Sequence, residues 1–516
     1  MKKRTIVVAA LIAGIILVGG LVALYINSQN TNLLSKLEDD EMSAKKLSEA
    51  KLTLYFSGEE PLVTREVLDQ LEQKAKKDLN IKVDFKFIAG NRESYLNQMK
   101  SIIASDTPCD AYYYSSSFLK DLRAIVKEGM AKDITKLYPL YAPNYYRGFS
   151  RREIAVASIN KKVYAVTQRL PSTQMRCAIV REDYMKKYHI PEIKSYADYE
   201  VYLQTIKENE PGITPMIYYE TSIGLFAEAN GYVVLNYWLG LVYKRDDPKM
   251  RIIPWEQAPE YRRGIETIQK WMNKGYLLKD LYVGQLDDTV ISTGRFASFI
   301  APLDMEIRAN SVLKSKDISW KYKAYPLYPE RIAERNSPLI GAMIISPRSK
   351  NAERTLMFIN WLQSKQENYD ALMYGVKGKH YQLEGEAVSI PESMNQARAY
   401  YNWPWRWPLE NIEFERPDYL EAGDLKKEYL NKIETLTKYP PHMGFTPDYG
   451  SLEKPVYFRR ASFYTVDQNI YSGLFKPSDI DAYITEQKSQ GVGKIVAEVQ
   501  KQMDRWLASE KKEAGN

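Results

Sequence analysis

The chain has 516 residues, too many for a single hydrophobic core, and its 45% hydrophobic and 27% charged residues are ordinary for a globular protein. The net charge is +7, but no run of five basic residues occurs, which argues against a nucleic-acid-binding protein. Tyrosine is abundant, with 40 tyrosines against 14 phenylalanines, and this favours either a compositional bias or an aromatic, partly polar binding surface.

The N-terminal segment is apolar. Residues 5–26 carry no charge and follow three basic residues, and as a helix they would be about 33 Å long, enough to cross a bilayer. We expect a single-pass membrane anchor that leaves the remainder of the chain on the extracellular side of the membrane. A cleaved signal peptide followed by secretion is the alternative. Residues 27–50 are polar and are expected to form a stalk.

Strands and helices then alternate along the chain. We expect strands at 51–57, 81–88 and 110–114, and helices at 61–77, 95–104 and 118–127. This alternation predicts βαβ units and a parallel sheet. In such sheets ligands bind beyond the carboxyl ends of the strands, which here carry small polar residues at 57–58, 89–91 and 115–117. Loops of this kind are also polar when no ligand binds there.

The later elements are less regular. We expect a strand at 175–183, buried strands at 292–302 and 337–347, and helices from Tyr184 and at 195–209, 259–274 and 351–364. The last hundred residues are expected to be mostly helical, and NYWLGLVY, which contains Trp238, is expected to be an aromatic helix. Cys109 and Cys177 lie in or beside expected strands, so both a disulfide and two buried thiols remain open.

Neither catalysis nor metal binding is indicated by the residue pattern. The three histidines are far apart, and no H-E-x-x-H, G-x-S-x-G or Walker A motif occurs. Acidic residues at 287–288 and 410–415 could supply the carboxylate pair of a glycoside hydrolase, but such pairs are common on solvated surfaces. We therefore expect neither an enzyme nor a bound cofactor or metal.

A series of stretches occurs in a distinctive order: LTLYFSGEEP, SDTPCDAYYYSS, GMAKDITKLYP, INKKVYAVTQ, CAIVREDYMKKYHIPEIKSYADYE and STGRFASFIAP. Together they resemble bacterial extracellular solute-binding proteins of family 1, the capture subunits of carbohydrate ABC importers. YGVKGKHYQL and the end of the chain, from MGFTPDYGSLEKP to KQMDRWL, are similar to a subgroup that includes LipO-type lipoproteins. The resemblance spans about residues 51–507. The family's lipid-bearing cysteine is absent, and the subgroup's W-x-W-G-N stretch reads WRWPL here.

The resemblance implies an α/β fold of two lobes, of the type II periplasmic-binding-protein kind, with the ligand held between them. Lobe one would hold residues 51–172 and about 343–392, and lobe two about 176–340 and 393–516, with crossings near 172–175, Gly341 and Pro391. The implied function is capture of a sugar or oligosaccharide for delivery to an ABC permease. A receptor that signals to a sensor partner is the alternative, and a surface carbohydrate-active enzyme is a third interpretation.

The family topology also implies which residues contact the ligand. From lobe one we expect Ser57, Gly58, Glu59, Tyr114, Ser115 and Ser116, with Gln168 and Arg169 near the first crossing. From lobe two we expect Asp304, Trp238 and Trp255. Capping of a helix is the alternative role for Asp304, and core packing is the alternative for the two tryptophans.

A further group of candidates lies in YNWPWRWPLE, where Trp403, Trp405 and Trp407 alternate with other residues. They would share one face if the stretch stays extended. We expect at least one of Trp405 and Trp407 to line the ligand site, with core packing of the cluster as the alternative.

Overall fold

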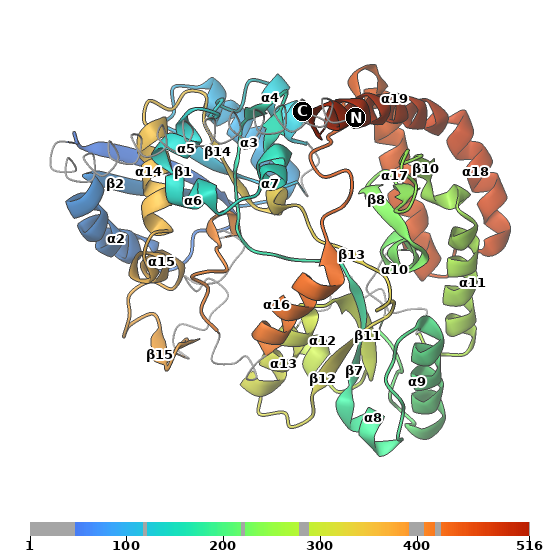
Figure 1. Ribbon diagram of the computed structural model, residues 1–516. Helices are drawn as coiled ribbons and strands as arrows, with labels where there is room; N and C mark the ends of the chain where they lie inside the picture. The colour runs from blue at the N-terminus through green and yellow to red at the C-terminus, as the bar shows by residue number, and fades with distance from the viewer. Residues whose placement is uncertain are drawn as a thin grey trace, which may run out of the picture.

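The computed structural model describes residues 47–116, 121–217, 222–277, 288–391, 407–417 and 425–514. The predicted anchor at residues 5–26 lies outside these ranges, as do Trp403 and Trp405. Within them, no helix combines the length and the apolar character needed to cross a membrane. The chain forms two α/β lobes that lie side by side and are joined by crossing segments (Figure 1).

Lobe one is built on a five-stranded sheet with the strand order β2-β1-β3-β14-β6. Its strands are β1 (Ala50–Ser57), β2 (Ile81–Ile88), β3 (Ala111–Tyr114), β6 (Val166–Thr167) and β14 (Ala342–Ile345). β1 is parallel to β2 and β3, as the alternation of strands and helices predicts, whereas β14 is antiparallel to β3 and β6. β3 and β14 are buried along their whole length, as in sheets that are covered on both faces.

Polar side chains fix the starts of several helices in lobe one. Asn91 accepts hydrogen bonds from two backbone amides of the following helix, and Asp121 and Ser150 do the same for one amide each. The lobe-one helices are α2 (Thr64–Leu79), α3 (Arg92–Ala104), α4 (Leu122–Lys127), α5 (Leu137–Tyr141), α6 (Pro143–Arg147), α7 (Arg151–Val156), α14 (Ala352–Leu362) and α15 (Gln366–Met373). Two hairpins complete it: β4 (Ser158–Ile159) with β5 (Lys162–Val163), and β15 (Gln382–Glu384) with β16 (Ala387–Ser389).

Lobe two contains an antiparallel sheet of β11 (Ser298–Pro302), β7 (Arg176–Arg181) and β12 (Tyr322–Pro326). The helices around it are α8 (Glu182–Lys187), α9 (Tyr196–Asn209), α10 (Ser222–Phe226), α11 (Pro259–Asn273), α12 (Asp288–Ser292), α13 (Met305–Ser315) and α16 (Leu425–Leu436). Ser195 caps α9, because its side chain accepts a hydrogen bond from the Asp198 amide. Trp271 is fully buried on α11.

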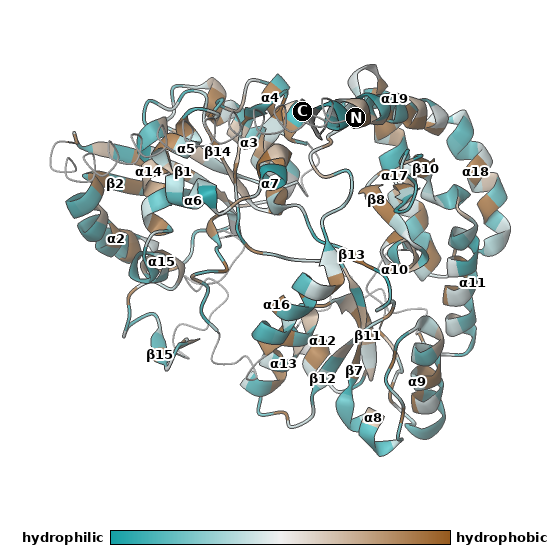
Figure 2. Cartoon of the chain, in the orientation of Figure 1, coloured by the Kyte–Doolittle hydropathy of each residue, from teal (hydrophilic) through white to brown (hydrophobic). Residues whose placement is uncertain are grey.

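The outer part of lobe two combines a small sheet with the C-terminal helices. The sheet contains β8 (Tyr232–Asn236), β9 (Leu241–Lys244) and β10 (Ile253–Pro254), and the helices are α17 (Glu453–Tyr471), α18 (Ile480–Ser489) and α19 (Val492–Ala514). Figure 2 shows hydrophilic and hydrophobic residues along α19, in keeping with a helix that packs through one face, here Ile495, Val499 and Met503.

The prediction of a helix in NYWLGLVY is wrong. The stretch is the end of β8, a turn that contains Trp238, and the start of β9. Residues of high β-propensity flank the turn, and Gly240 supplies the positive φ of 57° that closes it.

The two cysteines are free and buried in separate cores. Cys109 belongs to the core of lobe one and Cys177 to that of lobe two. Burial raises the pKa of the Cys109 thiol to about 12, and burial also raises the pKa of Cys177. Of the two alternatives left open by the sequence, the structure therefore contains the buried thiols.

Hydrogen bonds between crossing segments join the lobes. Thr173 of the first crossing bridges Arg335 of the second, and its hydroxyl donates to the Glu334 carbonyl over 2.6 Å. β13 (Ala333–Glu334) of the second crossing pairs in parallel with β17 (Thr437–Lys438). The three segments thus form a narrow band between the lobes, which is the place where hinge motion would be absorbed.

The third crossing lies further along the chain than predicted. Leu409 packs in the core of lobe one, and its carbonyl accepts a hydrogen bond from Gln363, so residues 407–417 belong to lobe one and not to lobe two. The chain therefore crosses after Pro417 rather than near Pro391.

After β17 the chain returns once more to lobe one. Met443 enters the lobe-one core, and Arg123 donates a hydrogen bond to the Thr446 carbonyl over 3.1 Å. The chain then leaves again to begin α17 in lobe two. The three predicted crossings do not include this return. The return places residues 443–452 between lobe one and α19.

Candidate ligand-binding site

Four strand ends meet at one edge of the lobe-one sheet. Tyr114 and Thr167, at the carboxyl ends of β3 and β6, both lie opposite Ala342 at the start of β14. β1 is in register with β3 through the pair Tyr55 and Tyr112, so Ser57 ends at the same edge. This edge faces the crossing segments, because the Ser116 and Gln168 amides donate to the carbonyls of Leu339 and Gly341.

The predicted lobe-one residues at this edge fall into two groups. Ser57 and Gly58 are half-buried, and Glu59 and Ser116 are exposed, so these four present surface that a ligand can reach. Tyr114 and Ser115 are fully buried. Burial raises the pKa of the Tyr114 hydroxyl, and the nearby charge of Asp121 raises it further. A ligand would therefore meet the first group, whereas Tyr114 and Ser115 hold the edge in place.

The side chain of Gln168 is buried, and its oxygen is a hydrogen-bond acceptor that has no donor within the part of the chain that the structure describes. Only 4% of its surface is exposed, and its side-chain oxygen, Oε1, has no hydrogen-bond partner among the described residues. A buried amide oxygen without a donor costs free energy, which a ligand hydroxyl at this position would recover. Gln168 is thus a polar side chain at the first crossing whose buried acceptor is unused among the described residues.

Arg169 forms contacts within lobe one. Its guanidinium forms two hydrogen bonds with the Glu413 carboxylate, at 3.0 and 2.6 Å, and lies 5.8 Å from the centre of the Phe149 ring. The backbones of Arg169 and Asn411 also form a parallel bridge. Arg169 therefore ties residues 411–413 to the first crossing, and its charge is already paired.

Asp304 lies at the lobe-two end of the crossing region. It follows β11, whose last residue pairs with Arg176 at the start of β7, and its side chain makes no capping hydrogen bond to α13. Asp304 is exposed, yet desolvation by the surrounding protein raises the pKa of its carboxyl, while the Asp304 and Met305 backbone amides and the charges of Arg176 and Arg308 lower it. Asp304 thus makes no standard capping hydrogen bond to α13, although the Met305 amide at the start of the helix stabilises the carboxylate.

The predicted tryptophans lie in different environments. Trp255 is fully buried, with its ring edge-on to those of Tyr232 and Tyr261, so it belongs to the core and not to a ligand site. Trp238 is half-buried in its turn, and its ring is edge-on to that of Tyr237. Trp407 begins a short 3-10 helix, Trp407–Leu409, while Trp403 and Trp405 lie outside the described residues.

The acidic run considered for hydrolysis is engaged elsewhere. Glu413 pairs with Arg169, and Glu415 accepts a hydrogen bond of 2.7 Å from the Tyr369 hydroxyl. Asp288 is the first residue of α12, and Asp287 lies outside the described residues. At least two of these carboxylates therefore hold the fold of lobe one together.

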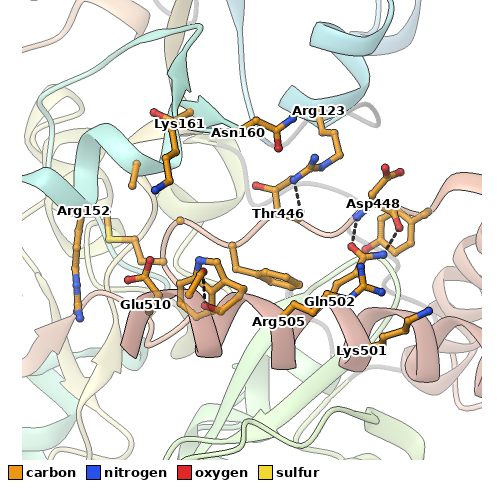
Figure 3. Close-up of a pocket in the computed structure, with 18 of the residues that line it drawn as sticks. Arg123, Arg152, Asn160, Lys161, Thr446, Asp448, Lys501, Gln502, Arg505 and Glu510 are labelled. Carbon is orange, nitrogen blue, oxygen red and sulfur yellow. Dashed lines mark hydrogen bonds between the residues drawn. The ribbon is translucent and has the colours of Figure 1, made fainter. Parts of the chain in front are cut away.

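A groove of about 1480 Å³ lies apart from the predicted site residues, none of which is among the residues that line it. One wall comes from lobe one, around α7 and the β4–β5 hairpin, and the other from residues 443–452 and α19 (Figure 3). Seven basic residues line it against three acidic ones. The groove could not be predicted from the sequence, because its basic residues come from segments that are more than 300 residues apart.

No protein-family model matches the chain. A carbohydrate ABC transporter substrate-binding protein of Streptococcus pneumoniae serotype 4 is 22% identical over 471 residues, which cover 89% of this chain and 91% of that protein. The crystal structure of the N-glycan transport solute-binding protein NgtS from S. pneumoniae is similar with a TM-score of 0.73 and 18% identity, and the match covers 89% of this chain and 99% of NgtS. NgtS in complex with Man5GlcNAc gives a TM-score of 0.63 with the same identity and coverage. The chain thus shares the two-lobed fold of these proteins over nearly its whole described length.

Proposed function

We propose that the protein is the extracellular solute-binding component of an ABC importer, which captures a sugar or oligosaccharide between its two lobes and delivers it to the permease. The observation that carries the proposal is the extent of the likeness to the pneumococcal substrate-binding protein, which spans 89% of this chain and therefore includes both lobes. The closer membership of the LipO-type subgroup rests on the sequence stretches YGVKGKHYQL and the end of the chain alone.

The chemistry of the residues around the crossing segments supports this proposal. Ser57, Ser116 and the oxygen of Gln168 offer hydroxyl and amide groups from lobe one, and the Asp304 carboxylate offers an acceptor from lobe two. Sugars carry many hydroxyls, each of which needs a partner when water is excluded. In this proposal, at least one of Trp405 and Trp407 covers an apolar sugar face.

A thermal-shift screen tests the proposal. The full chain in detergent micelles is melted in the presence of mono- and oligosaccharides, with peptides and lipids as comparison ligands. A ligand at 100 times its Kd stabilises the folded state by about 2.7 kcal/mol, which is readily measured. Stabilisation by peptides or lipids, with none by any saccharide, contradicts the proposal.

We also propose that residues 5–26 anchor the protein in the cell membrane, with both lobes on the extracellular side. The support is the uncharged run with its basic flank. N-terminal sequencing of the mature protein distinguishes the alternatives, because a chain that begins after about residue 23 has lost the anchor.

A further inference from the structure

The groove between lobe one and α19 has an unusual balance of charge. Four of its basic residues, Arg152, Lys494, Lys501 and Arg505, are exposed, and none of them forms an ion pair or side-chain hydrogen bond within the described ranges. Elsewhere the protein pairs many of its basic side chains, as in Arg169 with Glu413. A concave surface lined by unpaired cations concentrates anions.

Arg123 adds a fifth cation with unused bonding capacity. Its Nη2 donates to the Thr446 carbonyl, but its Nε is buried and has no acceptor among the residues described. Figure 3 shows Arg123, Arg152 and Lys161 on the side of lobe one, opposite Lys501 and Arg505 on α19. The positive groups therefore come from both walls of the groove.

Aromatic rings lie between these cations. Phe445 and Trp506 pack with ring centres 5.8 Å apart, and both line the groove together with Tyr146. All three side chains are half-buried, so part of each ring is accessible. Sugar rings present apolar C–H faces that pack on such aromatic surfaces, whereas an extended acidic peptide has no comparable need for them.

We infer that this groove is a second binding site, for an anionic glycan whose carboxylate or phosphate groups pair with the cations while its sugar rings pack on Phe445, Trp506 and Tyr146. Its volume exceeds the 300–1000 Å³ typical of small-molecule pockets, so several sugar units fit. The groove shares no residues with the candidate site around the crossing segments. The proposed groove site therefore does not depend on which sugar binds at that candidate site.

A charge-matched pair of variants tests this inference. In the groove variant, Arg152→Gln, Lys501→Gln and Arg505→Gln are combined. In the control, Lys76→Gln, Lys77→Gln and Lys427→Gln remove three exposed cations that lie outside the groove. Binding of fluorescent oligogalacturonate and of a phosphomannan oligosaccharide to each full chain, in detergent micelles, is measured by anisotropy at low and high salt.

The groove variant is expected to bind the anionic glycans at least about tenfold more weakly, since each exposed ion pair contributes a factor of up to about five. The control is expected to keep wild-type affinity, and wild-type binding should weaken in high salt. Preference for one probe identifies carboxylate or phosphate as the recognised group. Equal losses in both variants, no loss in either, or equally tight binding of poly-glutamate overturn the inference. Thermal shifts by neutral saccharides should be the same in the groove variant, which separates this result from a failure of the proposed function.

Discussion

At the residue scale, the side chains at the edge of the lobe-one sheet differ in burial and in pairing: Ser57 is half-buried and Ser116 exposed, whereas Arg169 is paired with Glu413. Ser57 and Ser116 can be chosen because strand ends follow from local hydrophobic runs. The pairing of Arg169 cannot be read in this way, because its partner Glu413 is 244 residues away. Trp255 shows the same limit, since a tryptophan after a proline occurs equally in an exposed loop and in a core.

Gln168→Met separates a ligand-binding role from a structural one. The substitution removes the buried Oε1 acceptor while keeping a similar volume, so the melting temperature without ligand should change little. Affinity for the saccharide found by thermal shift should fall by up to about tenfold, the value of one hydrogen bond. A marked drop in melting temperature with unchanged affinity would assign Gln168 to the structure alone.

His442 gives a prediction about pH. Its Nδ1 is 2.8 Å from the Tyr243 hydroxyl, and desolvation, with a contribution from Arg245, lowers its pKa from the ordinary 6.5 to about 4. Between pH 4 and pH 6.5 the His442 imidazole is therefore protonated in the unfolded chain but neutral in the folded chain. As a result, the free energy of unfolding falls as the pH falls from 6.5 to 4. The loss from this group should be about 2 kcal/mol at pH 5.

Urea unfolding at pH 7 and pH 5 measures this effect. In His442→Gln the difference in unfolding free energy between the two pH values should shrink by about the same 2 kcal/mol, because the titrating group is gone. An unchanged difference would show that other groups cause the acid sensitivity.

At the element scale, a buried ion pair attaches α17 to the small outer sheet. Arg459 and Glu256 form two hydrogen bonds of 2.8 and 2.7 Å, and Arg459 also donates to the Leu239 carbonyl in the β8–β9 turn. Both residues are only 2% exposed. The sequence could predict helix α17 but not this attachment, because its two partners are 203 residues apart.

Arg459→Met should destabilise the protein by about 3–5 kcal/mol, because it leaves the Glu256 carboxylate buried without a counter-charge. Arg262→Met is the matched control. Arg262 pairs with Asp481 of α18 at 2.8 Å and also donates to the Pro477 carbonyl, but its side chain is 41% exposed and that of Asp481 is 82% exposed, so its loss should cost about 1 kcal/mol. Chemical denaturation of both variants measures the difference. Similar values for the two would mean that burial does not govern the cost.

At the scale of the whole molecule, the two-lobed α/β fold follows from the order of the sequence stretches, whereas the lobe boundaries do not. Residues 407–417 were expected in lobe two, but Leu409 fills the core of lobe one. The return of residues 443–452 to lobe one was also not anticipated. Both depend on packing between distant segments, which local periodicity does not encode.

Closure of the lobes predicts a change in overall size. We expect the saccharide found by thermal shift to reduce the radius of gyration measured by small-angle X-ray scattering, because hinge closure compacts the molecule. A saccharide that gives no thermal shift is the control. Unchanged scattering on saturation would rule out closure.

The position of β14 governs the order in which the protein can fold. This strand lies between β3 and β6, yet it is separated from them along the chain by all of β7 to β13. Until residues 342–345 leave the ribosome, β3 and β6 have no strand between them, and the lobe-one core also waits for Leu409 and Met443. Such non-local pairing makes folding slow. A nascent chain that contains only the first 340 residues therefore has an open sheet edge that chaperones can recognise.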